Sequence, residues 1–156
     1  MIGDEYKQNK TFDNLRNNGY NNYKEILKSE NINREKYSKV LKEDQSVLTK
    51  NFIENGGIID TSEEAVRYLD MRKADGICFN NKLIFLRPDY SYSELIEELE
   101  HAKQFDNNKF NSDKIIELEI EAKTTTLSRL EKYNIPNIEI EDLKKQISYY
   151  KKLLKE

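Results

Sequence analysis

The sequence of 156 residues contains very little cysteine and histidine, and both shortages limit the chemistry that it can perform. Cys78 is the only cysteine, so the chain can form no internal disulfide bond and no zinc site built from several cysteines. His101 is the only histidine, which excludes any site that needs two histidines from one chain, such as an intact His-Glu-x-x-His zinc motif. With five glycines and no Gly-x-x-x-x-Gly-Lys segment, the sequence also lacks a phosphate-binding loop.

Long apolar runs and an excess of charge of one sign are also missing. No run approaches the roughly 18 apolar residues that a membrane-spanning helix needs, and the N-terminus has no apolar stretch of the kind that directs secretion. Lys and Arg total 26 and Asp and Glu total 29, with both signs interspersed along the chain. We therefore expect no membrane span and no classical signal peptide, and the charge pattern gives no reason to expect binding to nucleic acid.

Apolar residues at helical spacing, in contrast, recur over most of the chain. The predicted helical segments lie around residues 23–27, 37–41, 47–53 and 61–69, then at 91–105 and 112–133, and finally from after Pro136 to about 154. Gly56-Gly57 stops the third segment, and the fourth begins at Thr61-Ser62-Glu63-Glu64 with a capping hydroxyl and acids for its first turn. The run from 115 to 122 alternates like a strand, but its apolar pattern continues through Leu130 without a turn signal, so we assign it to a helix.

The clearest strand pattern is a hairpin. Ile77-Cys78-Phe79 and Leu83-Ile84-Phe85-Leu86 flank Asn80-Asn81, a pair that tolerates the positive φ angles of a tight turn. Ile58-Ile59 predicts a further short strand, and Cys78, within an apolar strand, is expected to be a buried thiol rather than a nucleophile. These patterns predict an α+β fold that is mainly helical, with a small antiparallel hairpin sheet directly before the helix at 91–105.

The predicted elements divide the chain into two regions. Residues 1–55 are expected to form a helical N-terminal region, and the first 22 residues, rich in Asn, Lys and Asp, predict a flexible lead-in. Residues 56–156 are expected to form the core of the protein together with its C-terminal helices.

The residues most suited to chemistry lie in the stretch Glu97-Glu98-Leu99-Glu100-His101. On a helix, Glu97 and His101 are four residues apart and Glu98 and His101 are three apart, so these side chains share a face. A second predicted helix places acids among large apolar residues, in Ile116-Glu117-Leu118-Glu119-Ile120-Glu121-Ala122. Two adjacent helices of this kind can supply three ligands to one cation and leave a position for water, as a catalytic zinc site requires.

These motifs resemble a known family. Glu97-Glu98-Leu99-Glu100-His101-Ala102-Lys103-Gln104, followed by Glu119-Ile120-Glu121-Ala122, is similar to the zincin-like metallopeptidase domains at the C-termini of bacterial polymorphic toxins. The order of hairpin, motif helix and acidic helix also resembles the minimal zincin core of ImmA/IrrE-type peptidases. The resemblance covers roughly residues 76–154, about half of the chain.

The resemblance implies a role for each matching residue. His101 would be a metal ligand, Glu121 the third ligand, and Glu98 the general base that polarises a metal-bound water for attack on a peptide carbonyl. The sequence departs from the family at Glu97, where a zincin has its first histidine. A carboxylate can also bind zinc, so the implied set is Glu97, His101 and Glu121 with zinc as the expected ion. Mn²⁺ or Mg²⁺ is the less favoured alternative, which two carboxylates would also suit.

The resemblance also implies a biological setting. It implies a bacterial toxin or effector that is cytoplasmic in the producing cell, is delivered to a target cell without a classical signal peptide, acts on a protein substrate there and has a cognate immunity protein.

Three other interpretations remain open from the sequence. Through Glu97 the chain could have lost its metal chemistry and become a non-catalytic protein-interaction module on a zincin scaffold. It could instead be a nuclease toxin with an acidic, Mg²⁺-dependent site. In the plainest interpretation, His101 is an ordinary helix residue and the neighbouring acids form a solvated face that pairs with lysines such as Lys103.

Overall fold

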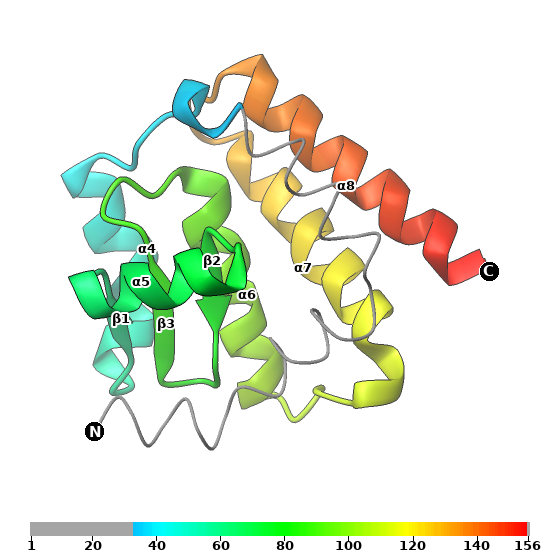
Figure 1. Cartoon of the computed structure of the whole chain (residues 1–156), viewed down its shortest axis with the longest axis horizontal. Helices are drawn as coiled ribbons and strands as arrows, with labels where there is room; N and C mark the ends of the chain where they lie inside the picture. Colours follow the sequence, from blue (N-terminus) through cyan, green and yellow to red (C-terminus); the bar gives the residue numbers. More distant parts are fainter. Residues whose placement is uncertain (1–32, 156) are drawn as a thin grey trace.

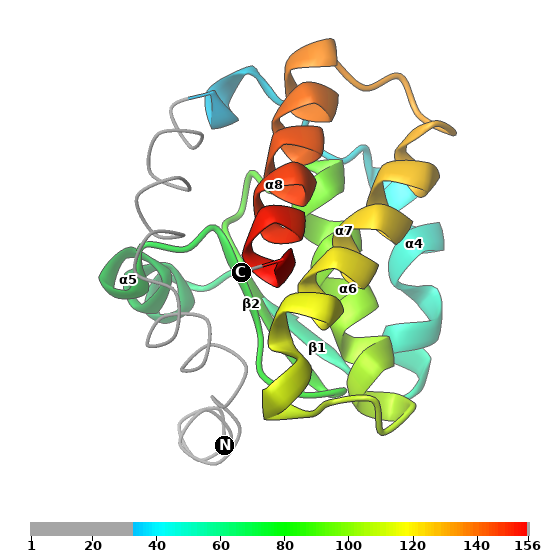
Figure 2. The ribbon, with the colours of Figure 1, turned by 90° about the vertical axis from the view of Figure 1, so that its right-hand side faces the viewer.

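The structure, a computed structural model, describes residues 33–155 (Figures 1 and 2). The predicted lead-in at 1–22 and the predicted helix around 23–27 lie outside the described residues. The elements in order are η1 (Arg34–Lys36), α4 (Lys42–Glu54), β1 (Ile58–Asp60), α5 (Glu63–Arg72), β2 (Gly76–Cys78), β3 (Leu83–Leu86), α6 (Tyr92–Asp106), η2 (Ser112–Lys114), α7 (Ile115–Leu130) and α8 (Asn137–Lys155), where η marks a 3-10 helix. The prediction of a mainly helical α+β fold is confirmed, and the run at 115–122 is helical.

The sheet is small and mixed. β2 and β3 pair antiparallel, as the hairpin pattern predicts, and β1 adds to the other edge of β3 in parallel, which gives the order β1-β3-β2. The chain reaches this parallel pairing through α5, because two parallel neighbours need a crossover between them. The sheet is therefore larger than an antiparallel hairpin alone.

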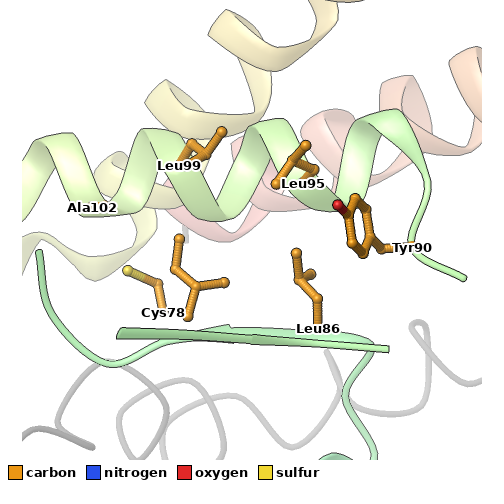
Figure 3. Close-up of a cluster of buried hydrophobic side chains, with 7 residues drawn as sticks. Cys78, Leu86, Tyr90, Leu95, Leu99 and Ala102 are labelled. Carbon is orange, nitrogen blue, oxygen red and sulfur yellow. The ribbon is translucent and has the colours of Figure 1, made fainter. Parts of the chain in front are cut away.

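Both faces of the sheet are buried, and alternate residues of the strands face opposite ways. Phe85 and its neighbours of the same parity pack against α5, where Leu69 is fully buried. Cys78 and Leu86 point to the other face, toward Leu95 and Leu99 of α6 (Figure 3). Successive residues of β2 and β3 face opposite sides of the sheet, and both sides are buried there. The sequences of these two strands are therefore continuously apolar rather than alternating.

The hairpin connection differs from the expected tight turn. Asn80 and Asn81 do not adopt positive φ, which among the described non-glycine residues occurs only at Lys73 and Asn108. The Asn80 side chain instead accepts a hydrogen bond from the Lys82 amide at 2.7 Å, and the Phe79 amide donates to the Leu83 carbonyl. An asparagine side chain can replace a backbone turn in this way.

Helix α6, which carries the candidate motif, has a well-defined start. The Ser91 side chain accepts from the Glu94 amide, and the Glu94 carboxylate accepts from the Ser91 amide, which completes a capping box. The side chain of Ser62 caps α5 by accepting from the Ala65 amide, as the sequence predicts.

Helices α6, α7 and α8 pack in succession and form a layer beside the sheet (Figures 1 and 2). Ile96 of α6, Leu130 of α7 and Leu143 of α8 belong to one buried apolar cluster. None of the described helices is long and apolar enough to cross a membrane.

The prediction of a helix around residues 37–41 is wrong. This segment is extended: the Val40 amide donates to the Tyr90 carbonyl, and Lys39 forms an isolated β-bridge with Ser91. Leu48 and Phe52 of α4, in contrast, pack against the core as their helical spacing predicts. The segment 37–41 is extended because its backbone pairs with Tyr90 and Ser91, which lie about 50 residues later in the sequence, just before α6.

Candidate metal centre

Helices α6 and α7 bring one histidine and two glutamates together. Glu97, His101 and Glu119 each offer one ligand atom, and these atoms lie within 4.8 Å of one another. His101 Nε2 is 3.1 Å from Glu119 Oε1 and 3.9 Å from Glu97 Oε2. The spacing of four residues places Glu97 and His101 one turn apart on the face of α6 that meets α7.

The cluster is almost completely shielded from solvent. The His101 side chain is 0% exposed, that of Glu119 is 1% exposed and that of Glu97 is 12% exposed. Buried carboxylates are stable only with cations or hydrogen-bond donors close to them. The burial therefore argues against the interpretation in which these residues form a solvated helix face.

A glutamine sets the orientation of the imidazole. His101 Nδ1 lies 2.9 Å from Gln104 Oε1, and the amide nitrogen of Gln104 donates to the Leu118 carbonyl and to Glu121. Because the amide nitrogen is occupied by two acceptors, the amide oxygen faces His101, and Nδ1 must be the donor of this bond. Nε2 is thereby directed at the carboxylates, 3.1 Å from Glu119 Oε1, and would be the atom that binds a metal ion.

A buried lysine completes the cluster. The Lys123 ammonium, on α7, lies 3.0 and 3.2 Å from the two oxygens of Glu97 and 4.0 Å from Glu119. It also donates to Gln146 at 2.7 Å and lies 5.6 Å from the centre of the Tyr150 ring, both on α8. This side chain is 1% exposed, so it supplies positive charge to the two carboxylates inside the protein.

The donor set fits a divalent cation. One imidazole nitrogen and two carboxylates are ligands that zinc and harder divalent ions accept, and two negative charges balance such an ion. Among the described residues, no other group of three or more His, Cys, Asp or Glu has its ligand atoms this close together. Glu97, His101 and Glu119 can therefore hold a metal ion. A Glu97 oxygen that binds the ion would give up its contact with Lys123.

Glu98, the predicted base, lies beside this cluster. It is 4% exposed, and together with Glu97 and Lys123 it lines a pocket between α6, α8 and the start of β2. Its carboxylate packs against Gly76, where a Cβ atom would come within 3.1 Å of Glu98 Oε2. A glycine at this point of β2 leaves the space that the Glu98 side chain fills.

Glu121, the predicted third ligand, does not join the cluster. Its side chain is 47% exposed, accepts a hydrogen bond from Gln104 and lies 3.5 Å from Lys109. Residues two apart on a helix point in nearly opposite directions, so Glu119 and Glu121 cannot face the same neighbour. Glu119, rather than Glu121, thus lies next to His101, and Glu121 accepts a hydrogen bond from Gln104, whose amide oxygen faces His101.

The helical period of α7 contained the information that selects Glu119. Ile115, Leu118 and Ala122 are the buried apolar residues of this stretch, and Glu119 and Lys123 fall on the same side of the helix. The expectation for Glu121 came instead from the Glu-x-Glu-Ala motif of the similar family, in which Glu121 directly precedes Ala122. No pattern in the sequence pointed to Lys123 as a buried residue, because an isolated lysine is almost always exposed.

Further carboxylates surround the pocket. Glu94 accepts two hydrogen bonds from the Arg34 guanidinium at 2.6 and 2.9 Å, and Arg34 lies 3.7 Å from Asp75. Burial raises the pKa of Glu94 to about 7, and the charge of Asp75 adds to the increase, while Arg34 opposes it. Glu94 and Asp75 are therefore acids at the pocket that already have a cationic partner in Arg34.

No protein-family model matches the chain, and no curated protein or solved structure matches it either. A functional proposal therefore rests on the geometry of the described residues.

Proposed function

We propose that the chain is a zincin-like, metal-dependent peptidase of the toxin or effector type. The supporting observation is the convergence of Glu97, His101 and Glu119 from two helices, with one ligand atom of each within 4.8 Å of the others. The order of hairpin, Glu-Glu-x-x-His helix and acidic helix supports the same proposal, with Glu119 in place of Glu121 as the third ligand.

In this proposal each residue of the chain has a separate task. A zinc ion held by Glu97, His101 and Glu119 would lower the pKa of a water molecule and polarise the peptide carbonyl. Glu98 would accept the proton of the attacking water and deliver it to the leaving amine. Gln104 would keep His101 Nδ1 protonated, so that Nε2 remains available as a ligand. A protein substrate in another cell and a cognate immunity protein belong to the same proposal.

The test begins with metal content. Elemental analysis of the purified chain after incubation with zinc should give about one equivalent, and His101→Ala and Glu119→Gln should each lose it, since each removes a ligand. Glu121→Gln is the matched control, because this exposed acid on the same helix is outside the cluster. Loss of the ion in Glu121→Gln but not in Glu119→Gln would contradict the assignment.

The second step separates binding from catalysis. Glu98→Gln should keep the bound ion and lose about 100-fold or more in the rate of peptide hydrolysis, the usual contribution of a general base. Unchanged hydrolysis by Glu98→Gln would show that another group takes the proton.

One observation favours a second candidate function, a non-catalytic protein-interaction module on the same scaffold. The Lys123 ammonium contacts both oxygens of Glu97 and lies 4.0 Å from Glu119, so it can neutralise the carboxylates without a metal ion. In that case the chain would bind no zinc at any concentration that the folded protein tolerates, and His101→Ala would leave its function unchanged.

A further inference from the structure

The pocket beside the candidate metal centre is acidic well beyond the metal ligands. Its lining includes five carboxyl groups from the residue before β2, from α6 and from α8: Asp75, Glu94, Glu97, Glu98 and Glu139. Lys123 is the only cationic side chain among the described residues of this lining. Lys123 contacts Glu97, whereas Asp75 and Glu94 pair with arginines outside this lining, Arg34 with both and Arg87 with Asp75.

Glu139 is an acid of this pocket with a carboxylate oxygen that the described residues leave unsatisfied. The residue is 1% exposed, and its Oε2 atom accepts a hydrogen bond from the Ser93 amide at 3.0 Å. Its Oε1 atom is buried and has no hydrogen-bond donor among the described residues. A buried carboxylate oxygen without a donor is unfavourable by itself, and a ligand that donates hydrogen bonds there would remove this penalty.

The other side of the same acidic wall already binds a guanidinium group. Arg34 donates to both oxygens of Glu94, at 2.6 and 2.9 Å, and lies 3.7 Å from Asp75. Burial, with a smaller contribution from Asp75, keeps the pKa of Glu94 raised to about 7 in spite of this contact. Arg87 also lies 3.1 Å from Asp75, so this acidic wall accommodates guanidinium groups.

The distribution of the acids indicates the class of cation. Among the described residues, only the cluster of Glu97, His101 and Glu119 brings three ligand atoms to one point. The other carboxyl groups are spread around the pocket, an arrangement that suits an extended cation with several N–H donors better than a second metal ion.

We propose that this pocket binds the side chain of a lysine or arginine of the substrate, with Glu139 as one of its hydrogen-bond acceptors. The proposal rests on the peptidase function, and it gives that function a substrate class: protein segments with a basic residue next to the cleaved bond.

The experiment measures binding and cleavage separately. Acetylated peptide amides of the sequence Ala-Ala-X-Ala-Ala, where X is lysine or arginine, are compared with the uncharged analogues norleucine and citrulline. Binding to the metal-free full chain is followed by NMR shifts of backbone amides, and cleavage is followed with the zinc-loaded chain. Glu139→Gln keeps an oxygen for the Ser93 amide and removes the charge, and Glu141→Gln is the matched control on the exposed face of α8.

The basic peptides should bind about tenfold or more tightly than their analogues, since a charge-assisted hydrogen bond contributes about this much. Glu139→Gln should lose most of this preference, and Glu141→Gln should keep it. Equal binding of lysine and norleucine peptides would overturn the pocket proposal, whether or not the chain cleaves peptides. Preferential binding of basic peptides that depends on Glu139, without any cleavage, would support the pocket and contradict the peptidase function instead.

Discussion

At the scale of single residues, Lys123 is the most informative side chain of the candidate centre. Its ammonium is buried between α6, α7 and α8 and contacts the carboxylate of Glu97. Removing one partner of a buried ion pair leaves the other charge uncompensated, which is more damaging than replacing the whole pair. The role of Lys123 therefore distinguishes a metal centre from a lysine that permanently replaces the metal.

We expect Lys123→Met to lower the free energy of unfolding of the metal-free protein by about 3 kcal/mol, because Glu97 and Glu119 lose their cation. If the cluster binds zinc, the ion should restore most of this loss, since a ligand present at 100 times its Kd adds about 2.7 kcal/mol. Urea unfolding of the variant with and without zinc measures both effects. Lys144→Met, on the exposed face of α8, is the control and should change little. A variant that zinc does not stabilise would favour the interaction module.

At the scale of elements, the contact between β2 and α6 places the predicted base. Gly76 begins β2, and a Cβ atom there would come within 2.9 Å of Leu86 and 3.1 Å of Glu98. The candidate metal ligands, Glu97 and His101 on α6 and Glu119 on α7, are not among the three heavy atoms nearest to this Cβ. The position of Glu98 and the position of the ion ligands can therefore be changed separately.

Gly76→Ala should consequently displace the Glu98 side chain and leave the ion ligands in place. We expect a loss of about 1–2 kcal/mol in the free energy of unfolding, as is usual for an added methyl group in a packed site. We also expect unchanged zinc content and a clear decrease in the rate of peptide hydrolysis. Thermal unfolding, elemental analysis and a hydrolysis assay test the three expectations. Loss of zinc with full retention of the rate would show that β2 positions the ligands rather than the base.

At the scale of the whole molecule, the segment before α4, at the start of the described chain, is hydrogen-bonded to α8 at its end. The Tyr37 hydroxyl donates to Asp142 of α8 at 2.6 Å, and Asn33 donates to the same carboxylate at 3.3 Å. Arg34 connects this segment to Glu94 of α6. Burial and the hydrogen bond with Asp142 raise the pKa of Tyr37 above its ordinary value of 10.0.

This raised pKa makes the stability depend on pH at the alkaline end. Folding disfavours the ionised form of Tyr37, so its contribution is complete below pH 10 and is lost progressively as the pH rises above 10. We expect wild type to lose stability above pH 10 more steeply than Tyr37→Phe, which has no hydroxyl to ionise. At pH 8, the variant should be less stable by about 1.5–3 kcal/mol, because it loses a hydrogen bond to a charged group. Urea unfolding at pH 8 and at two pH values above 10 compares the two proteins, and identical alkaline slopes would exclude a contribution from Tyr37.

The sequence predicted most of the fold because the signals are local. The caps, the helical spacing and the apolar hairpin strands correctly predicted α4 to α8, β2 and β3. It failed at 37–41, where hydrogen bonds with Tyr90 and Ser91 override the local helical pattern. It also could not specify that β1 pairs in parallel with β3, because that pairing depends on how α5 crosses between them.

For the candidate site, the sequence by itself determined that Glu97, Glu98 and His101 share a helix and that an acidic helix follows. The apolar period of α7 favours Glu119 over Glu121 for the buried side of that helix. The contact of Glu119 with His101, and the burial of Lys123 and Glu139, were decided only by the tertiary structure. The physical reason is that spacing along one helix defines which residues share a face, whereas the rotation of α7 and α8 about their axes is set by packing against α6. That packing turns Glu119 inward and leaves Glu121 at the surface.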